Sequence, residues 1–169
     1  MKRVVLAVGL AWLMGGCAGY VPVARYAKMT LPSPVYVGIN LSGAEPQQGV
    51  YIKEEINKMV LNRFHGTITQ KKELCSSQIY VTSYKITYKP LNYDKDGFVI
   101  RYQASATLNL KLYSSNGILK KSVSATEEMN TQSSSLLNNS AKERAIRASI
   151  QKALDLFVAY VAKVGIKEK

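Results

Sequence analysis

Side chains that could carry out covalent or proton-transfer chemistry are few in this chain. Its 169 residues include two cysteines, Cys17 and Cys75, and one histidine, His65. The serines at 133–135 have no partner base for nucleophilic catalysis, and no histidine and cysteine spacing fits a metal site. His65 follows a predicted helix, where a polar residue is commonly found. The sequence therefore predicts a protein that is not an enzyme and that has no metal or other cofactor.

Cys17 is the exception, because its surroundings predict a covalent modification. Lys2 and Arg3 precede an uncharged run of eleven residues, and small residues follow it, which is the pattern of an export signal. A run of this length is too short to span a bilayer. Residues 13–17, Leu-Met-Gly-Gly-Cys, resemble a bacterial lipobox, which is cut just before the cysteine. An ordinary signal peptide with a cysteine near the cut is the alternative.

The lipobox resemblance implies a lipoprotein signal peptide over residues 1–16 and a mature chain whose first residue, Cys17, is acylated on its sulfur and its amine. Several acyl chains make a stable membrane anchor, whereas one binds only marginally. Ala18 follows the cysteine, and in many Gram-negative bacteria a residue other than Asp there directs a lipoprotein to the outer membrane. We therefore expect a lipid-anchored protein on the periplasmic face of the cell outer membrane. Cys75 is then the only remaining thiol, so we expect no internal disulfide and assign it no chemistry.

The charge of the chain narrows the choice of partner. Its 23 Lys and Arg against 11 Asp and Glu give a net charge of +12. Such a charge favours polyanions, namely nucleic acid, anionic lipid head groups or phosphorylated glycolipid. Because export separates the chain from nucleic acid, a nucleic-acid partner is not expected.

Residues 17–34 contain three prolines and predict an extended, lipidated tether. Residues 35–169 are long enough for one domain with its own core. Its expected elements begin with a strand over 35–40 and a helix from about Ile52 to Phe64 with Gly66 as its cap. Strands over 78–89 and 98–113 and a fourth strand after Gly117 follow. A loop over 131–139 then leads to a helix from Ser140 to Gly165, in which Ser140 and Glu143 form a capping box.

The pair Asn116-Gly117 predicts a tight hairpin turn between the last two strands. If Ser115 pairs with Ile118, then Leu110 lies opposite Val123 and Thr107 lies opposite Thr126. This register places apolar residues on one face of both strands and polar residues on the other, whereas a slip of one residue would expose the apolar set to water.

The element order, strand, helix, three strands, helix, predicts an α+β fold. With the elements in the chain order β-α-β-β-β-α, we expect a two-layer sandwich: a four-stranded sheet with two helices on one of its faces. The other face would be polar and uncovered, and Arg101, Lys111 and Lys120 would lie on or beside it.

The lipobox, a tether with Tyr20 and Pro22 soon after the cysteine, the element order and the basic charge together resemble the LptE family of lipopolysaccharide-assembly lipoproteins. The segment Tyr93–Ala104 is similar to what divergent members carry between their second and third strands. Many members have glycine directly after the cysteine and then an aromatic residue, whereas here Ala18 precedes that pair.

The resemblance implies an outer-membrane plug and assembly factor. Members sit inside the β-barrel protein LptD, help it fold, and assist delivery of lipopolysaccharide to the outer leaflet. A polar sheet face suits the polar wall of a barrel lumen. Arg101, Lys111 and Lys120 are then candidate contacts to the phosphates of lipid A. The alternative for each of them is an ordinary solubilising charge, which is the more common role of a single surface Lys or Arg.

Another class of function stays open from the residues alone. The chain could be an anchored periplasmic accessory lipoprotein, such as a pilotin or a transport auxiliary subunit, that binds a peptide of a secretion or lipid-transport machine along a free sheet edge. A surface adhesin with affinity for saccharide is a third possibility.

Overall fold

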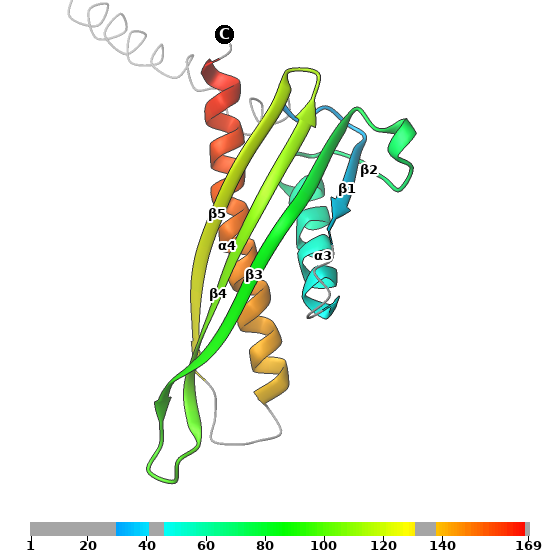
Figure 1. The fold of residues 1–169 in the computed structure, drawn as a ribbon. Coiled ribbons are helices and arrows are strands. Elements are labelled where there is room, and N and C mark those ends of the chain that lie inside the picture. The colour runs from blue at the N-terminus through cyan, green and yellow to red at the C-terminus, as the bar shows by residue number, and fades with distance from the viewer. Residues whose placement is uncertain (1–29, 41–45, 131–137, 168–169) are drawn as a thin grey trace, which may run out of the picture.

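The computed structural model describes residues 30–40, 46–130 and 138–167. These residues form an α+β sandwich in which two long helices lie on one face of a 5-stranded mixed sheet, as Figure 1 shows. The predicted fold class is therefore confirmed. The elements in chain order are β1 (Val35–Ile39), α3 (Pro46–Asn62), β2 (Ile68–Thr69), the 3-10 turn η2 (Lys72–Leu74), β3 (Ser77–Tyr93), β4 (Val99–Ser114), β5 (Gly117–Asn130) and α4 (Asn138–Lys167).

The sheet has one strand more than the sequence predicts. Its order is β2-β1-β3-β4-β5. The additional strand, β2, has two residues and pairs in parallel with β1, with Val35 opposite Ile68. A strand this short has no alternation of apolar and polar residues to reveal it, so the prediction of four strands was wrong.

The core lies between the helices and the sheet face that they cover. Leu108, Leu110 and Leu112 of β4 are at most 1% exposed and point toward the helices, as the strand alternation predicts. The main buried side chains of the helices are Ile52, Ile56 and Val60 of α3 and Ile150, Leu154 and Phe157 of α4. Because these helices cover one face, the opposite face of β3, β4 and β5 carries no described element, and we call it the open face (Figure 1).

The β4–β5 hairpin has the predicted faces but a different register. The structure pairs Ser114 with Gly117, Leu108 with Val123 and Thr107 with Ser124, which is two residues away from the predicted pairing. The turn is therefore Ser115-Asn116, and the residue with a positive φ is Gly117, at 116°. The predicted register was wrong, but a shift of two residues leaves every side chain on its face.

A bulge in β3 redistributes its side chains between the two faces. Val81 pairs with Leu110 and Ser83 pairs with Asn109, so Thr82 is the extra residue. Tyr80 consequently lies on the open face, opposite Lys111. Tyr84 and Tyr88, which would share a face with Tyr80 in an unbroken strand, pack against the core instead.

Both helices depart from their predicted ends. After α3, His65 has a φ of 50° and the Gly66 amide donates to the Val60 carbonyl at 3.0 Å. His65 is therefore the residue that ends the helix with a left-handed backbone conformation, one residue before Gly66, the predicted cap. At the other helix, α4 begins two residues before Ser140, so Ser140 is not its N-cap. The Glu143 carboxylate instead accepts a hydrogen bond from the Arg147 Nε at 2.8 Å.

The described chain starts close to the body of the domain. Thr30 and Leu31 are each 1% exposed. The Ser77 hydroxyl donates to the Pro32 carbonyl at 2.7 Å, and the Thr67 amide donates to the Ser33 hydroxyl at 3.1 Å. Cys17 and the predicted signal peptide lie outside the described residues. Within the described residues, neither helix has a stretch long and apolar enough to cross a membrane.

Candidate functional site

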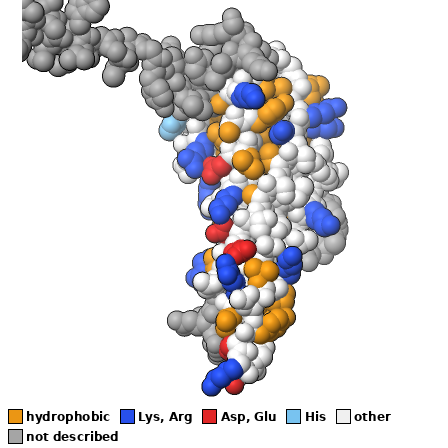
Figure 2. Space-filling view, turned by 90° about the vertical axis from the view of Figure 1, so that its left-hand side faces the viewer, with side chains coloured by type: hydrophobic (Ala, Val, Ile, Leu, Met, Phe, Trp, Pro, Cys, Tyr) orange, Lys and Arg blue, Asp and Glu red, His pale blue; other side chains and the backbone are white. Residues whose placement is uncertain are grey.

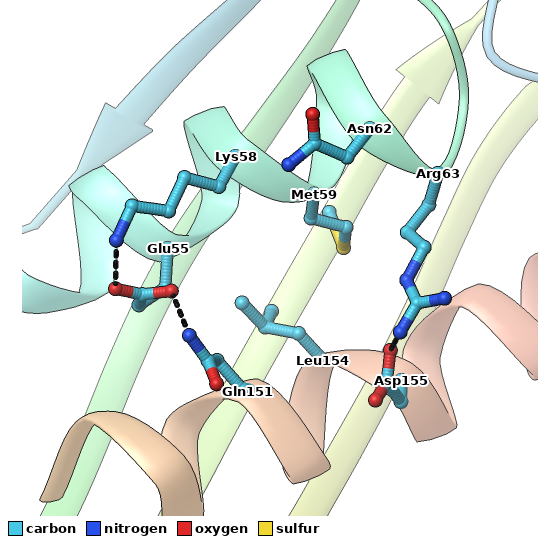
Figure 3. A pocket seen from close by; sticks show the side chains of 8 residues that line it. All are labelled: Glu55, Lys58, Met59, Asn62, Arg63, Gln151, Leu154 and Asp155. Carbon is cyan, nitrogen blue, oxygen red and sulfur yellow. Dashed lines mark hydrogen bonds and ion pairs between the residues drawn. The ribbon is translucent and has the colours of Figure 1, made fainter. Parts of the chain in front are cut away.

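Two hollows on the described surface could hold a ligand. The first lies between α3 and α4 and has a volume of about 340 Å³. Figure 3 shows its side chains: Glu55 meets Gln151 and Arg63 meets Asp155 across the gap between the helices, while Lys58 meets Glu55 on the same helix. Its lining residues are Glu55, Lys58, Met59, Asn62, Arg63, Gln151, Leu154 and Asp155.

The charged groups of this interhelical hollow are already paired. The Glu55 carboxylate accepts hydrogen bonds from the Lys58 Nζ at 2.8 Å and the Gln151 Nε2 at 2.7 Å (Figure 3). Arg63 and Asp155 form an ion pair at 3.0 Å between their Nη2 and Oδ1 atoms. The Glu55–Lys58 pair lies within α3, whereas the Glu55–Gln151 and Arg63–Asp155 contacts reach across to α4. We therefore interpret the hollow as part of the helix packing and not as a binding site.

Burial and ion pairing shift the pKa values of Glu55 and Arg147, at the interface of the two helices, in opposite directions. Burial raises the pKa of the Glu55 carboxyl, but the hydrogen bonds from Lys58, Gln151 and Arg147 outweigh it, and the pKa lies below its ordinary value of 4.5. Burial lowers the pKa of the Arg147 guanidinium, but Glu54, Glu143 and Glu55 outweigh it and raise the pKa. Both groups therefore remain charged at neutral pH, as a structural ion-pair network requires.

The open face is different, because its middle is a set of short polar side chains bonded to each other. The hydroxyls of Ser105 and Thr126 lie 3.1 Å apart, and those of Thr107 and Ser124 lie 2.9 Å apart. The Asn109 amide donates to the Ser83 hydroxyl at 2.8 Å. These cross-strand pairs give β3, β4 and β5 a continuous hydrophilic surface, which we call the polar ladder.

The second hollow lies on the open face beyond the end of the polar ladder. It is a groove of about 780 Å³ on the surface of β1, β3 and β4. A row of rings from neighbouring strands, Tyr36, Tyr80 and Tyr113, forms its floor, with centroids 6.0 Å and 5.8 Å apart. Basic side chains Lys72 and Lys111 line it, together with Asn40, Gln78 and Thr82. We call it the tyrosine-lysine groove.

The three predicted basic residues all lie on the open face, but in two places. Lys111 and Lys120 lie directly opposite each other on β4 and β5. Arg101 is ten residues along β4 from Lys111, which is about 33 Å in an extended strand. Its Nη2 forms an ion pair with the Glu128 Oε2 at 2.5 Å. The structure therefore brings Lys111 and Lys120 together and separates Arg101 from them.

Apart from Lys111, no residue of the groove was predicted from the sequence to bind a ligand. Tyr36, Tyr80 and Tyr113 come from three strands, and Lys72 comes from η2, which lacks a clear sequence signal. The only available signal was the repeated tyrosine in strands, which is equally typical of core packing.

Basic side chains are not confined to the groove. Figure 2 looks onto the side of the molecule formed by β5 and α4, where Lys and Arg side chains are spread along the whole length and acidic side chains lie among them. Charges of β5 and α4 also pair with each other, as Lys152 does with Glu127. Positive charge alone therefore does not distinguish a site, whereas unpaired lysines beside a hollow do.

Several solved structures are similar to this chain at low sequence identity, and the one with a TM-score above 0.5 shares its fold. A putative lipoprotein from Caulobacter crescentus has a TM-score of 0.54 at 8% identity, over 85% of this chain and 96% of that one. Rare lipoprotein B from Shewanella oneidensis has a TM-score of 0.49 at 10% identity, over 78% and 97%. Lipoprotein B from Nitrosomonas europaea has a TM-score of 0.49 at 14% identity, over 82% and 91%. No curated protein matches the sequence.

The sequence itself matches a family model over most of the domain. The matched residues, 35–161, begin with β1 and extend into α4, so they include the whole sheet and α3. The model is that of LptE, described as lipopolysaccharide-assembly. This chain therefore belongs to the LptE family of lipopolysaccharide-assembly proteins, as its sequence pattern predicted.

Proposed function

We propose that this chain is an outer-membrane lipoprotein, anchored through Cys17, that assists assembly of an LptD-like β-barrel and delivery of lipopolysaccharide to the outer leaflet. In this role it acts as a plug in the barrel and as a lipopolysaccharide-binding subunit. LptE is a non-enzymatic family of lipopolysaccharide-assembly lipoproteins, which agrees with a role in binding and assembly. The anchor at Cys17 rests on the lipobox resemblance of residues 13–17.

The observation that carries this proposal is the open face with its polar ladder. The helices bury the other face, so Ser105, Thr107 and Asn109 remain available to a partner. Each makes a hydrogen bond to a side chain of a neighbouring strand and keeps further hydrogen-bonding capacity, which another polar surface can satisfy on docking. The lumen wall of a transmembrane β-barrel is such a surface.

Basic residues on the same face support contact with lipopolysaccharide. Lys111 and Lys120 lie side by side, and like charges at opposing strand positions repel unless an anion lies between them. Phosphate groups of lipid A would be such anions, bound through charge-assisted hydrogen bonds. Arg101 would contribute at a separate place, because it is ten residues along β4 from Lys111. Its guanidinium is also paired with Glu128.

Gentle purification in detergent tests the barrel partner. We expect a large outer-membrane β-barrel to accompany the lipoprotein in a stoichiometric complex. A photoreactive amino acid at Thr107, on the open face, should cross-link to the barrel, whereas the same residue at the exposed Lys53 of α3 should not. Recovery of a secretin or of an inner-membrane ABC complex in place of the barrel would refute the proposal.

Charge reversal tests the lipopolysaccharide contacts. Arg101→Glu and Lys111→Glu together should weaken lipopolysaccharide binding, because two cations become anions on the open face. Each single variant shows which of the two separate places contributes. Unchanged binding in the double variant would exclude these residues as contacts.

One observation favours a second candidate function, that of an accessory lipoprotein that binds a peptide. Strand β5 is at the edge of the sheet, and a peptide could add to its outer side as a further strand. Charged residues, among them Lys120, Lys121 and Glu127, are frequent along β5 and discourage pairing with other strands. The open face is therefore the better docking surface, and the cross-linking experiment separates the two.

A further inference from the structure

The tyrosine-lysine groove has a floor whose central ring is held in place by the backbone beneath it. A Cβ atom built at Gly38 of β1 would lie 2.4 Å from the Cε1 atom of Tyr80, so any side chain at this position would require the Tyr80 ring to move. The ring of Tyr80 therefore lies across Gly38, between Tyr36 at 6.0 Å and Tyr113 at 5.8 Å. The Tyr36 ring is tilted by 54° from the Tyr80 ring, and the Tyr113 ring meets it edge to face at 88°. The three rings therefore form an apolar platform centred on Tyr80, with a tilted ring on one side and an edge-on ring on the other, on a face that is otherwise polar.

Cations border this platform without carboxylate partners. The Lys72 Nζ lies 5.8 Å from the centroid of the Tyr80 ring. Lys111 is opposite Tyr80 across β3 and β4, and Lys120 is opposite Lys111. Among the described residues none of these three lysines takes part in an ion pair, although Glu73 is next to Lys72 in the chain. Elsewhere on the open face the charge of Arg101 is matched by Glu128.

Neutral hydrogen-bonding groups complete the lining. Asn40, Gln78 and Thr82 border the groove. The side-chain amides of Asn40 and Gln78 offer donors and acceptors, whereas the Thr82 hydroxyl donates to the Asn109 carbonyl at 3.1 Å and offers an acceptor only. A ligand that fits this groove has a flat apolar side for the rings, hydroxyls for the amides, and negative charge for the lysines. A pocket of this kind takes its specificity from a few placed polar groups beside an apolar surface.

We propose that the tyrosine-lysine groove is a binding site for a phosphorylated sugar. The apolar side of the sugar ring rests on Tyr80 and its neighbours, and Lys72 and Lys111 bind the phosphate, with Lys120 adding to the positive potential. This site deepens the proposed function. One possible source of the ligand, the phosphorylated glucosamine head group of lipid A, rests on that proposed function. The other source is a soluble sugar phosphate with the same chemistry.

Calorimetric titration of the full-length protein in detergent tests the chemistry. The probes are glucosamine 1-phosphate, glucosamine and inorganic phosphate. We expect glucosamine 1-phosphate to bind about tenfold more tightly than either of the others, because it alone engages both the rings and the lysines. Equal affinity for inorganic phosphate and glucosamine 1-phosphate would overturn the inference, because the tyrosine platform would then contribute nothing.

Matched variants locate the site. Lys72→Gln with Lys111→Gln should weaken binding of glucosamine 1-phosphate at least about tenfold. Lys85→Gln is the control, because Lys85 is an exposed lysine on the open face of β3 outside the groove. Tyr80→Phe should retain most of the affinity and Tyr80→Ala should lose it. Equal losses in the groove variant and the control would show nonspecific charge attraction and overturn the site.

Gly38→Ala provides a second test that removes no ligand-contacting group. The added methyl must displace the Tyr80 ring, so affinity for glucosamine 1-phosphate should fall while the lysines stay unchanged. Far-ultraviolet circular dichroism checks that the variant remains folded. A folded Gly38→Ala protein with unchanged affinity would show that Tyr80 is not part of the site.

Lipid A presented in detergent micelles distinguishes the two sources. If the double lysine variant loses both lipid A and glucosamine 1-phosphate, the groove binds the lipid head group. If it loses only glucosamine 1-phosphate, the ligand is a soluble sugar phosphate. Co-purification of the β-barrel is measured in parallel. A barrel complex without binding of glucosamine 1-phosphate would refute only the groove as a sugar-phosphate site. Binding of glucosamine 1-phosphate without a barrel partner would refute only the role as a plug.

Discussion

The Glu55 carboxylate and the Arg147 guanidinium join α3 to α4 at the centre of the helix layer. The Glu55 side chain is 1% exposed, and its Oε1 atom lies 3.2 Å from the Arg147 Nη1. The same guanidinium also binds Glu54 at 2.7 Å and lies 4.3 Å from the Tyr51 ring centroid. A buried carboxylate of this kind is stable only while its donors are present.

The low pKa of Glu55 predicts a pH dependence of stability. Because the folded-state pKa lies below the ordinary 4.5, the ionised carboxylate stabilises the fold above about pH 4.5, and this contribution is lost as the pH falls through the folded-state pKa. We expect Glu55→Gln to lower the free energy of unfolding at neutral pH and the difference from the unaltered protein to shrink in acid. Urea unfolding between about pH 7 and about pH 3 measures this. Glu73→Gln, in an exposed turn, is the control, and an equal pH-dependent difference there would contradict the assignment to Glu55.

Removal of the Arg147 guanidinium should destabilise the fold even at neutral pH. Arg147→Met leaves Glu55 with Lys58 and Gln151 only, and we expect a loss of about 2 kcal/mol in the free energy of unfolding. Arg144→Met, an exposed position on the same helix, should change it by less than about 0.5 kcal/mol. Urea denaturation of both variants gives the comparison. A loss at Arg147 no larger than that at Arg144 would show that the interhelical pairs contribute no stability.

Engineered disulfides test the register of the β4–β5 hairpin. The structure places Thr107 opposite Ser124, whereas the register expected from the sequence places it opposite Thr126. In a protein carrying Cys75→Ser, the pair Thr107→Cys and Ser124→Cys should form a disulfide on mild oxidation, because directly opposed Cβ atoms lie within reach of one. The pair Thr107→Cys and Thr126→Cys should stay reduced. Mass spectrometry after thiol alkylation shows which of the two cysteine pairs has formed a disulfide. A disulfide between positions 107 and 126, and none between 107 and 124, would support the register expected from the sequence.

The lipid anchor is tested at the one residue that should carry it. Cys17→Ala should abolish incorporation of labelled fatty acid and release the protein from the membrane fraction, because the acyl chains are the anchor. Cys75→Ala should leave both unchanged, since Cys75 lies in the folded domain and its thiol donates to the Lys72 carbonyl. A Cys17→Ala protein that still incorporates fatty acid would contradict the predicted lipidation.

The sequence by itself determined the fold class and the family of this chain. Strict alternation in β4 assigns Leu108, Leu110 and Leu112 to the core, and the structure buries all three. The helical spacing of Ile52, Ile56 and Val60 likewise predicts the buried side of α3. These patterns are local and repeat with the period of the element, so they can be read without knowledge of the neighbours.

Only the tertiary structure decided how these elements meet. Burial along a strand alternates with a period of two. The predicted and observed registers of β4 and β5 differ by two residues, so both bury the same side chains of β5 and the sequence pattern cannot distinguish them. The bulge at Thr82, which separates Tyr80 from Tyr84, has no residue type that marks it in the sequence. The tyrosine-lysine groove depends on that bulge and on the pairing of β1 with β3, so it exists only where segments far apart in the chain come together.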